Sequence, residues 1–318
     1  MNHTIRDIGV AQQIGAYSDA IETRAKLRWL FTSGTPGLPV DGTLPDDITG
    51  QAELAWTHAL RMLEQAGMTL APVAVDADGM VVSHGVATAP RARAAVVTPA
   101  HQSPLCVSLS LPRRLALLDW AAQAGAWIVE DDYDGEYRYV GRPLPALKSL
   151  DRAGRVLYAG TFSKVLFPAL RLAYLVVPPE QVRRFEDSCQ TFSSAGPALT
   201  QAIVSDFMNE GHFARHIQRM RRLYAERRRI AADGLAAVLG RHLRIDPQPG
   251  GMHLVLRMKG HHTDRALAAR MLADGMAALA LSHRTVLPHA ASALLLGFTN
   301  IDTPQRAREL GQRIRKLL

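Results

Sequence analysis

The stretch that decides the fold is Trp127-Ile128-Val129-Glu130-Asp131-Asp132-Tyr133-Asp134, followed further along by Arg155-Val156-Leu157-Tyr158-Ala159-Gly160-Thr161-Phe162-Ser163-Lys164. In both segments a short apolar run, typical of a buried strand, ends in polar residues. Strands that are apolar on both faces and alternate with helices predict a parallel sheet with covered faces. The polar residues then lie at the carboxyl edge of the sheet, where open α/β sheets bind ligands.

The same alternation extends on both sides of this stretch. Ser110 is expected to be the N-cap of a helix that runs to about Ala124 and has Pro112 in its first turn. We expect strands at 70–75, 94–97, 172–177, 253–256 and 293–296. Helices are expected at 19–31, at 52–67 with Gly67 as C-cap, through most of 179–239, at 263–273 and at 304–317. A loop rich in proline and glycine covers 32–47.

These elements predict an α/β fold with a mostly parallel sheet, helices on both of its faces, and a smaller C-terminal α+β subdomain. The expected boundaries place a linker-like segment at 1–50 and a large ligand-binding domain, present in part, at 51–210. A long helix and the small subdomain follow at 211–318.

Composition places the chain among ordinary globular proteins. It has 318 residues, of which 47% are hydrophobic and 21% charged, and no apolar run long enough to span a membrane. Residues 1–17 lack the pattern of a secretory signal, which favours a cytoplasmic protein. The two cysteines do not have metal-ligand spacing, so we expect reduced thiols and no metal site.

The net charge of +8 is concentrated in an arginine-rich segment at 215–229. Such a segment is a solvated helix face or a nucleic-acid contact. No recognition-helix motif or interleaved aromatic accompanies it, so we expect no sequence-specific DNA binding by this chain alone.

The polar residues after the two strands have the chemistry that pyridoxal 5'-phosphate (PLP) requires. This cofactor needs an amine for a Schiff base, an acid beside the ring nitrogen, and donors for its phosphate. Lys164 is the amine and Asp131 the acid, while Tyr133 can donate to the ring oxygen. The phosphate can be held by Thr161, Ser163 and Arg171. Taken alone, the acidic run also fits a turn that binds nothing or a pair of metal carboxylates, and Lys164 fits a surface lysine. Together the residues favour the cofactor.

The segment from Trp127 to Pro178 resembles the PLP-binding core of fold-type-I, class I/II aminotransferases. More narrowly, the chain from about residue 52 to 318 resembles the aminotransferase-like effector domain of MocR/GabR-type regulators of the GntR family. The motifs that carry this resemblance are Glu130–Tyr139, Gly141–Leu147, Gly160–Arg171, Gly211–His216 and Arg221–Tyr224.

The resemblance implies a covalent bond of Lys164 to PLP, Asp131 at the ring nitrogen and Tyr133 at the ring oxygen. By the same resemblance Thr161, Ser163 and Arg171 hold the phosphate, an amino acid or amine is the small-molecule partner, and the protein is a homodimer. Trp56 falls where the family has a ring-stacking aromatic, although a core aromatic fits it as well. Ser103 stands where many of these enzymes have a ring-contacting asparagine.

Several features depart from the family pattern. We expect neither the winged-helix domain nor the early glycine-rich segment that receives the phosphate at a helix N-terminus. The strand at 294–298 has no arginine for a substrate carboxylate, and His283 and Arg284 are the substitutes nearby. His101 and His253 are expected to be structural, because Lys164 can itself move the proton in transamination.

Three functions remain open after this reading. The chain is a transaminase that acts through Lys164, a PLP- or amine-sensing module without full turnover, or a degenerate member that no longer binds PLP. A receiver-like phosphoacceptor domain is disfavoured by Arg171, by the single acidic cluster and by the length of the chain.

Overall fold

The computed structural model describes residues 3–5, 20–24, 28–32, 67–141, 144–170, 172–192, 198–246, 248–260, 263–285 and 292–318, the first three segments and 188–192 as backbone only. The chain divides into two compact units. One consists of Met1–Ala71 with Arg183–Gly196, and the other of Pro72–Val182 with Pro197–Leu318. The second unit contains every site residue discussed below that the structure describes.

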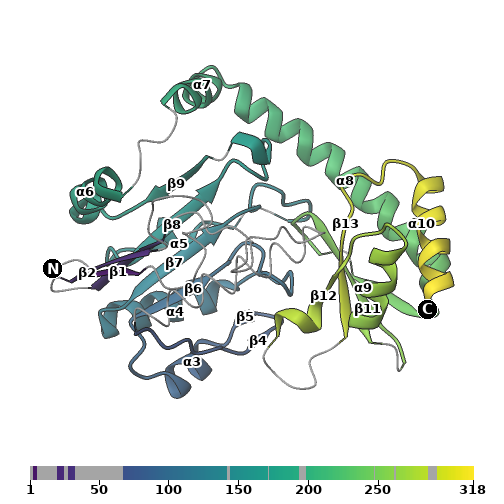
Figure 1. Ribbon diagram of the computed structural model, residues 1–318, viewed down its shortest axis with the longest axis horizontal. Coiled ribbons are helices and arrows are strands. Elements are labelled where there is room, and N and C mark those ends of the chain that lie inside the picture. Colours follow the sequence, from purple (N-terminus) through teal and green to yellow (C-terminus); the bar gives the residue numbers. More distant parts are fainter. Residues whose placement is uncertain are drawn as a thin grey trace. The chain divides into compact units, whose positions relative to one another are not determined.

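The centre of the second unit is a four-stranded sheet in the order β6-β7-β8-β9 (Figure 1). Strands β6 (Ala94–Val97), β7 (Trp127–Asp132) and β8 (Val156–Thr161) are parallel, so the sheet is mostly parallel, as the sequence predicts. Strand β9 (Ala173–Val176) runs antiparallel to β8, and all four of its residues are exposed. The expectation of a parallel, covered strand was therefore wrong at this edge, because direction and cover depend on chain connections and partners that a strand's own residues do not encode.

Helix α4 (Leu111–Ala124) packs against one face of this sheet. Leu117 and Ala121 of the helix contact Ile128 and Val156 of the strands in a buried cluster. The helix has the predicted bounds, and Gly125 ends it in the left-handed region with φ of 62°. Ser110 is the N-cap residue but its side chain makes no capping hydrogen bond. Short elements surround this layer: β4 (Val75–Asp76), β5 (Gly79–Met80), α3 (Val82–Thr88) and α5 (Leu147–Leu150).

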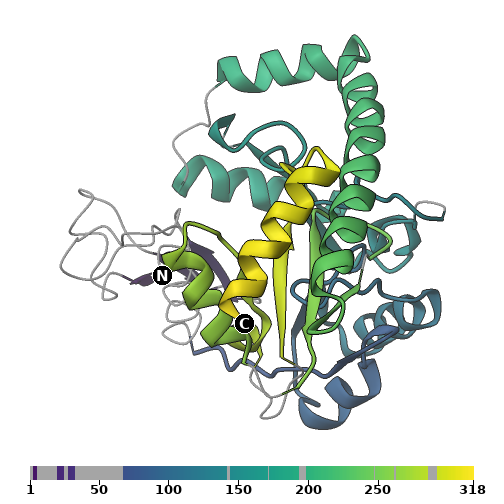
Figure 2. The ribbon, with the colours of Figure 1, turned by 90° about the vertical axis from the view of Figure 1, so that its right-hand side faces the viewer.

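The C-terminal subdomain is an antiparallel sheet in the order β10-β11-β13-β12, packed against helices (Figure 2). Its strands are β10 (Leu243–Asp246), β11 (His253–Met258), β12 (Leu279–Ala280) and β13 (Ala293–Gly297). The helices are α8 (His212–Leu239), α9 (Asp264–Ala273) and α10 (Pro304–Leu317). Helix α7 (Ala198–Asn209) precedes α8, and its Val204 packs in a different cluster with Phe162 and Val165. Leu254, Leu256, Leu294 and Leu296 point from the sheet into one core with α8 and α10. Where α8 meets α10, a Cβ on Gly234 would lie 2.4 Å from that of Ala307, so glycine permits the close approach.

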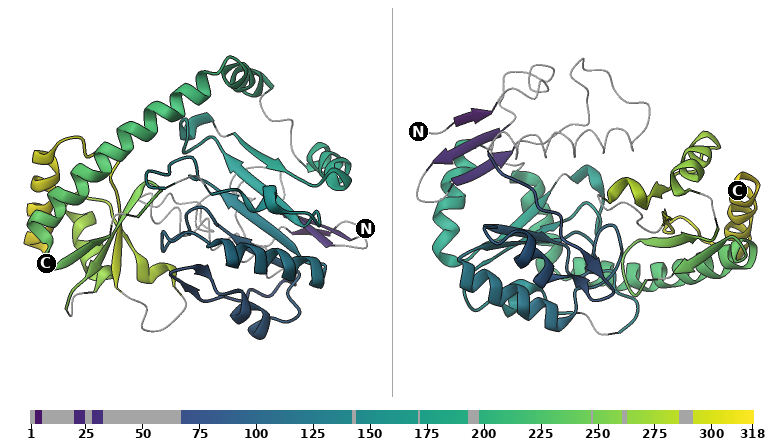
Figure 3. Two further views of the ribbon diagram at one scale, coloured as in Figure 1. Left: turned by 180° about the vertical axis from the view of Figure 1, so that it is seen from behind. Right: turned by 90° about the horizontal axis from the view of Figure 1, so that it is seen from below.

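Two other sequence predictions were wrong. The described residues of 19–31 are strands and not a helix. Strand β2 (Ala20–Arg24) pairs with both β1 (His3–Ile5) and β3 (Arg28–Thr32) in a separate sheet, which lies in the first unit (Figure 3). The strand expected at 70–75 is reduced to the two residues of β4. Both segments are short and partly apolar, and periodicity alone does not separate helix from strand there. The helix expected at 52–67 lies outside the described residues, except for Gly67.

The first unit also contains most of helix α6 (Val182–Phe192). Short 3-10 turns occur at Pro168–Leu170, Pro179–Gln181 and Leu281–Arg284. Within the described residues, none of the helices is both long enough and apolar enough to cross a bilayer.

Candidate functional site

Strands β7 and β8 place the predicted residues at one edge of the sheet. The register pairs Asp131 with Ala159 and Asp132 with Gly160, so both strands end at the same level. Because side chains alternate along a strand, Asp131 points to one face of the sheet, whereas Glu130 and Asp132 point to the face covered by α4. The hydrogen bond from Tyr158 Oη to Asp132 Oδ2, of 2.9 Å, is consistent with this alternation.

Asp131 and Lys164 are charged side chains at this edge of the sheet. Both are exposed, and neither side chain forms a hydrogen bond or ion pair with the part of the chain that the structure describes. Partial burial and the neighbouring carboxylates of Asp132 and Asp134 raise the pKa of Asp131. A cation brought next to Asp131 would lower that pKa again, and a protonated pyridine nitrogen is such a cation.

The loop that carries Lys164 is fixed to helix α8. His216 Nε2 lies 2.9 Å from the backbone oxygen of Val165. Tyr137 donates from Oη to the backbone oxygens of Lys164 and Val165 over 3.5 Å each. Phe162 and Val165 are buried on both sides of Lys164. The lysine is therefore an exposed side chain on a well-anchored backbone.

The residues predicted to hold a phosphate lie next to Lys164 where the structure describes them. Thr161 ends β8, and its Oγ1 accepts a hydrogen bond of 3.1 Å from the backbone nitrogen of Ser163. Gly160 leaves no room for a larger residue here, because a Cβ would lie 2.2 Å from the ring of Tyr174. Two other predicted residues, Arg171 and Trp56, lie outside the described residues.

Tyr133 contacts a histidine from the loop before α4. Its hydroxyl donates to the backbone oxygen of His101 over 3.1 Å and lies 3.2 Å from His101 Nδ1. Burial and nearby negative charge raise the pKa of the Tyr133 phenol. A side-chain hydrogen bond with Ser103 opposes this increase but does not outweigh it. The structure thus brings together Tyr133 and Ser103, which the sequence places thirty positions apart.

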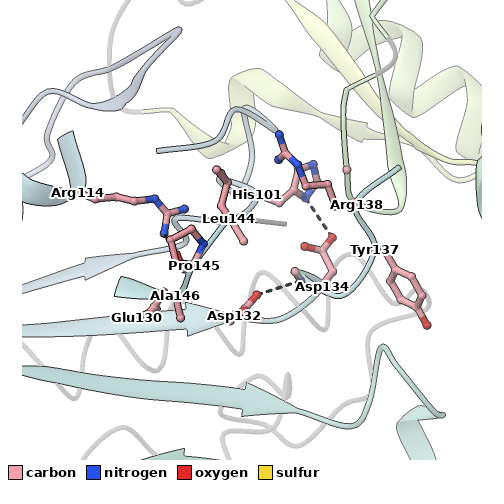
Figure 4. A pocket seen from close by; sticks show the side chains of 14 residues that line it. His101, Arg114, Glu130, Asp132, Asp134, Tyr137, Arg138, Leu144, Pro145 and Ala146 are labelled. Atoms are coloured by element: carbon pink, nitrogen blue, oxygen red, sulfur yellow. Dashed lines mark hydrogen bonds and ion pairs between the residues drawn. The ribbon is translucent and has the colours of Figure 1, made fainter. Parts of the chain in front are cut away.

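Behind this edge is a small cavity of about 50 Å³ that the predicted site residues do not line (Figure 4). It contains the alternate carboxylates of β7 and the turn after it, namely Glu130, Asp132 and Asp134. Each carboxylate has a partner: the backbone nitrogens of Leu147 and Lys148 donate to Glu130, the Tyr158 hydroxyl donates to Asp132, and His101 pairs with Asp134. The cavity is therefore a structural polar interior on the opposite face from Asp131, and we assign no cofactor to it.

The sequence does not single out Arg114 or Asp134, and it predicts a structural His101 without identifying its partner. Arg114 is 1% exposed and donates to the backbone oxygens of Pro99, Leu109 and Pro145. His101 and Asp134 form a buried ion pair of 3.1 Å, with 4% and 2% of their side chains exposed. Side chains alternate in direction along a strand. Applied to Glu130–Asp134, this rule could have separated the acids that face the interior from Asp131.

The His101–Asp134 pair keeps the imidazole charged. Burial alone would lower the pKa of His101, but hydrogen bonds and charge from Asp134 and Cys106 outweigh burial and raise the pKa to about 10. Burial lowers the pKa of His253, the other histidine of interest, and the positive charges of His101 and Lys164 add to this effect.

Protein stability is expected to fall as pH rises from 6.5, the ordinary histidine value, to about 10. In this window the folded state keeps a proton on His101 that the unfolded state has lost, so unfolding becomes easier by about 1.4 kcal/mol for each pH unit. Urea unfolding of wild type and Asp134→Asn at several pH values measures the slope. The variant should show a clearly flatter slope, and equal slopes would contradict the assignment.

Strand β13, on which the sequence has no arginine for a substrate carboxylate, is apolar. Leu295 is buried in a cluster with Cys106, Val255, Leu281 and Ala293. The sequence suggested His283 or Arg284 in place of that arginine. His283 is exposed on the 3-10 turn before β13, and the structure does not describe the side chain of Arg284. The described part of this sheet therefore offers no arginine at that position.

Comparison with known proteins finds similar sequences and similar structures, although a scan against models of protein families finds no match. The chain is 39% identical over 263 residues to the probable rhizopine catabolism regulatory protein MocR of Rhizobium meliloti, a match covering 83% of this chain and 53% of MocR. It is 36% identical over 209 residues to the HTH-type pyridoxine biosynthesis transcriptional regulator PdxR of Corynebacterium glutamicum, covering 66% and 45%.

Among solved structures, LysN, the alpha-aminoadipate aminotransferase of Thermus thermophilus complexed with N-(5'-phosphopyridoxyl)-L-leucine, is similar with a TM-score of 0.71 and 26% identity, over 82% of this chain and 69% of LysN. The chain spans about half the length of the curated relatives it matches. The fold is that of fold-type-I aminotransferases, as the sequence predicts.

Proposed function

Because the chain belongs to the aminotransferase-like family that includes the MocR-type regulators, we propose that it binds pyridoxal 5'-phosphate at the carboxyl edge of β7 and β8, through Lys164. The observation that carries the proposal is that two opposite charges, Asp131 on β7 and Lys164 in the loop after β8, have no hydrogen-bond or ion-pair partner among the described residues. The cofactor would offer each of these groups a partner of opposite charge or a bonding partner.

The donor set fits the cofactor. Lys164 presents an amine for the aldehyde, Asp131 a carboxylate for the ring nitrogen, and Tyr133 a hydroxyl for the ring oxygen. Thr161 and Ser163 present hydroxyls for the phosphate, and we propose that Arg171 completes that group and that Trp56 and Ser103 flank the ring. When bound, the cofactor supplies an electron-poor ring that stabilises negative charge on a substrate carbon.

The residues of the chain would orient the cofactor and move protons. Asp131 would hold a proton on the ring nitrogen, since a carboxylate and a protonated nitrogen stabilise each other's charge. Lys164, on its anchored loop, would take a proton from the α-carbon of a bound amine and return it at a neighbouring carbon. Full transamination of an amino acid or amine by these steps is our first candidate function.

A second candidate is a sensing module that binds cofactor and amine without complete turnover. Two observations favour it: the similarity to regulators such as MocR and PdxR, and the apolar Leu295 on β13. A module of this kind needs to bind the cofactor and the amine, but it does not need to complete the reaction and release a product. We propose a cytoplasmic, homodimeric protein in either case.

A spectroscopic titration tests the proposal. Adding PLP to the purified protein should produce a visible absorption band that free PLP lacks. With the band present, single-turnover mixing with an amine distinguishes the candidates: a transaminase forms the keto product and is restored by a keto acid, whereas a sensor changes its spectrum without forming product. Absence of any new band with PLP in excess would contradict both and leave a protein that has kept only the fold.

Replacing Asp131 by asparagine should weaken cofactor binding while leaving the fold intact. The exposed side chain makes no described contact that the fold needs, but the variant loses a charge-assisted hydrogen bond to the ring, a loss of about 1.5–3 kcal/mol or roughly 10- to 150-fold in Kd. PLP titration measures Kd and circular dichroism monitors the fold. Unchanged affinity would remove Asp131 from the proposed site.

A further inference from the structure

His101 is a buried histidine whose Nδ1 atom lies between two functional groups. It is 3.1 Å from Asp134 Oδ2 and 3.2 Å from the hydroxyl oxygen of Tyr133. The same hydroxyl lies 3.1 Å from the backbone oxygen of His101. One residue therefore contacts the Tyr133 hydroxyl from two directions.

The proton positions follow from the chemistry of these groups. Asp134 is 2% exposed and, as a carboxylate, can only accept, so the shared proton lies on Nδ1 of His101. Nδ1 then donates toward both Asp134 and the Tyr133 oxygen. Tyr133 must use its own proton for the backbone oxygen of His101 or for an acceptor on a ligand. When the Tyr133 hydroxyl rotates to point its proton at a ligand, the hydroxyl oxygen still accepts from Nδ1 of His101.

The surrounding backbone fixes His101 in this position. Arg114 holds both ends of the loop by donating to the backbone oxygens of Pro99 and Leu109. Gly251, with φ of 77°, packs directly on the imidazole, because a Cβ there would lie 1.9 Å from Cε1. The backbone nitrogen of Gly251 donates over 2.8 Å to the oxygen of Tyr137, which ties the C-terminal sheet to the turn after β7.

We propose that His101, oriented by Asp134, is a positioning residue that holds the Tyr133 hydroxyl so that its proton can be presented to a ligand. The contact between His101 and Tyr133 is a property of the protein itself. Its consequence for the cofactor rests on the proposed function, in which Tyr133 donates to the ring oxygen.

Two substitutions at His101 differ in where they place a donor. In His101→Asn the side-chain amide nitrogen lies as many bonds from Cα as Nδ1 does, so it can still donate to Tyr133 and Asp134. In His101→Gln the amide lies one bond further out, at the level of Nε2. The control is Asp264→Asn, since Asp264 is also 2% exposed and hydrogen-bonded but belongs to the C-terminal subdomain.

The first experiment uses cofactor-free protein labelled with ¹³C at tyrosine Cζ. The Tyr133 signal is assigned by its loss in Tyr133→Phe. It should shift in His101→Gln and in Asp134→Asn, remain near the wild-type position in His101→Asn, and be unchanged in Asp264→Asn. A Tyr133 signal that ignores both His101 and Asp134 would overturn the proposal, whether or not the protein binds PLP.

The second experiment is a double-mutant cycle on the Kd for PLP. His101→Gln should weaken binding about tenfold, in line with one hydrogen bond to a functional group. In a Tyr133→Phe background the same change should have little further effect, because the two residues act through one contact. Independent, additive losses would overturn the positioning role. A wild type that binds no PLP would refute the proposed function alone, and the tyrosine spectra would then decide the proposal.

Discussion

Replacing Lys164 by alanine should abolish covalent attachment of PLP. The amine of Lys164 is exposed on a loop fixed by His216 and Tyr137, and we propose it as the group that bonds to the cofactor aldehyde. Borohydride treatment of wild type with PLP, followed by peptide mass mapping, should place a pyridoxyl group on Lys164. The variant should show none and should lose the visible band of the protein-bound cofactor.

Lys316→Ala is the matched control for this experiment. Lys316 is an exposed lysine near the end of α10, away from the proposed site, and its replacement should leave the labelling of Lys164 complete. Labelling at another lysine in the wild type would mean that the PLP aldehyde reacts non-specifically with surface amines and not at a specific binding site. That result would refute the proposed role of Lys164.

Replacing Arg114 by methionine should destabilise the protein by about 3–5 kcal/mol. The guanidinium is almost fully buried and donates to three backbone oxygens, at Pro99, Leu109 and Pro145, over 2.6–2.8 Å. Methionine fills much of the space but leaves those oxygens without their donor, and unsatisfied buried acceptors are costly. Urea unfolding at neutral pH measures the loss.

The adjacent Arg113 provides the control. It donates to the backbone oxygen of Met80 and to Asp76, with a quarter of its side chain exposed (25%). Because an exposed ion pair contributes little, Arg113→Met should cost no more than about 1 kcal/mol. Similar losses for the two variants would mean that charge or helix propensity in α4, and not the buried hydrogen bonds, determines the effect.

Arg114 also connects stability to the proposed site. The loop that it holds at both ends contains His101, whose imidazole contacts Tyr133. We expect Arg114→Met to weaken PLP binding as well, since a loosened loop no longer fixes His101. The effect on binding should be smaller than that of Tyr133→Phe, which removes the hydroxyl itself.

The sequence by itself determined the features that depend on local pattern. Apolar runs followed by polar residues located β7 and β8, and their shared direction placed Asp131 and Lys164 at one edge. Helices α4, α9 and α10 were predicted nearly to the residue. The structure adds that Thr263 caps α9, since its side chain accepts a hydrogen bond from the backbone nitrogen of Ala266.

Only the tertiary structure decided the features that depend on distant partners. Nothing local distinguishes β9 from its parallel neighbours, and its reversed direction follows from the path of the chain. Pairing with β1 and with each other, rather than periodicity, determines that β2 and β3 are strands. The contact of His101 with Tyr133 and Asp134 needs the loop, the turn after β7 and Gly251 together. Buried polar groups must find partners wherever the fold brings them, and the sequence around His101 does not contain those partners.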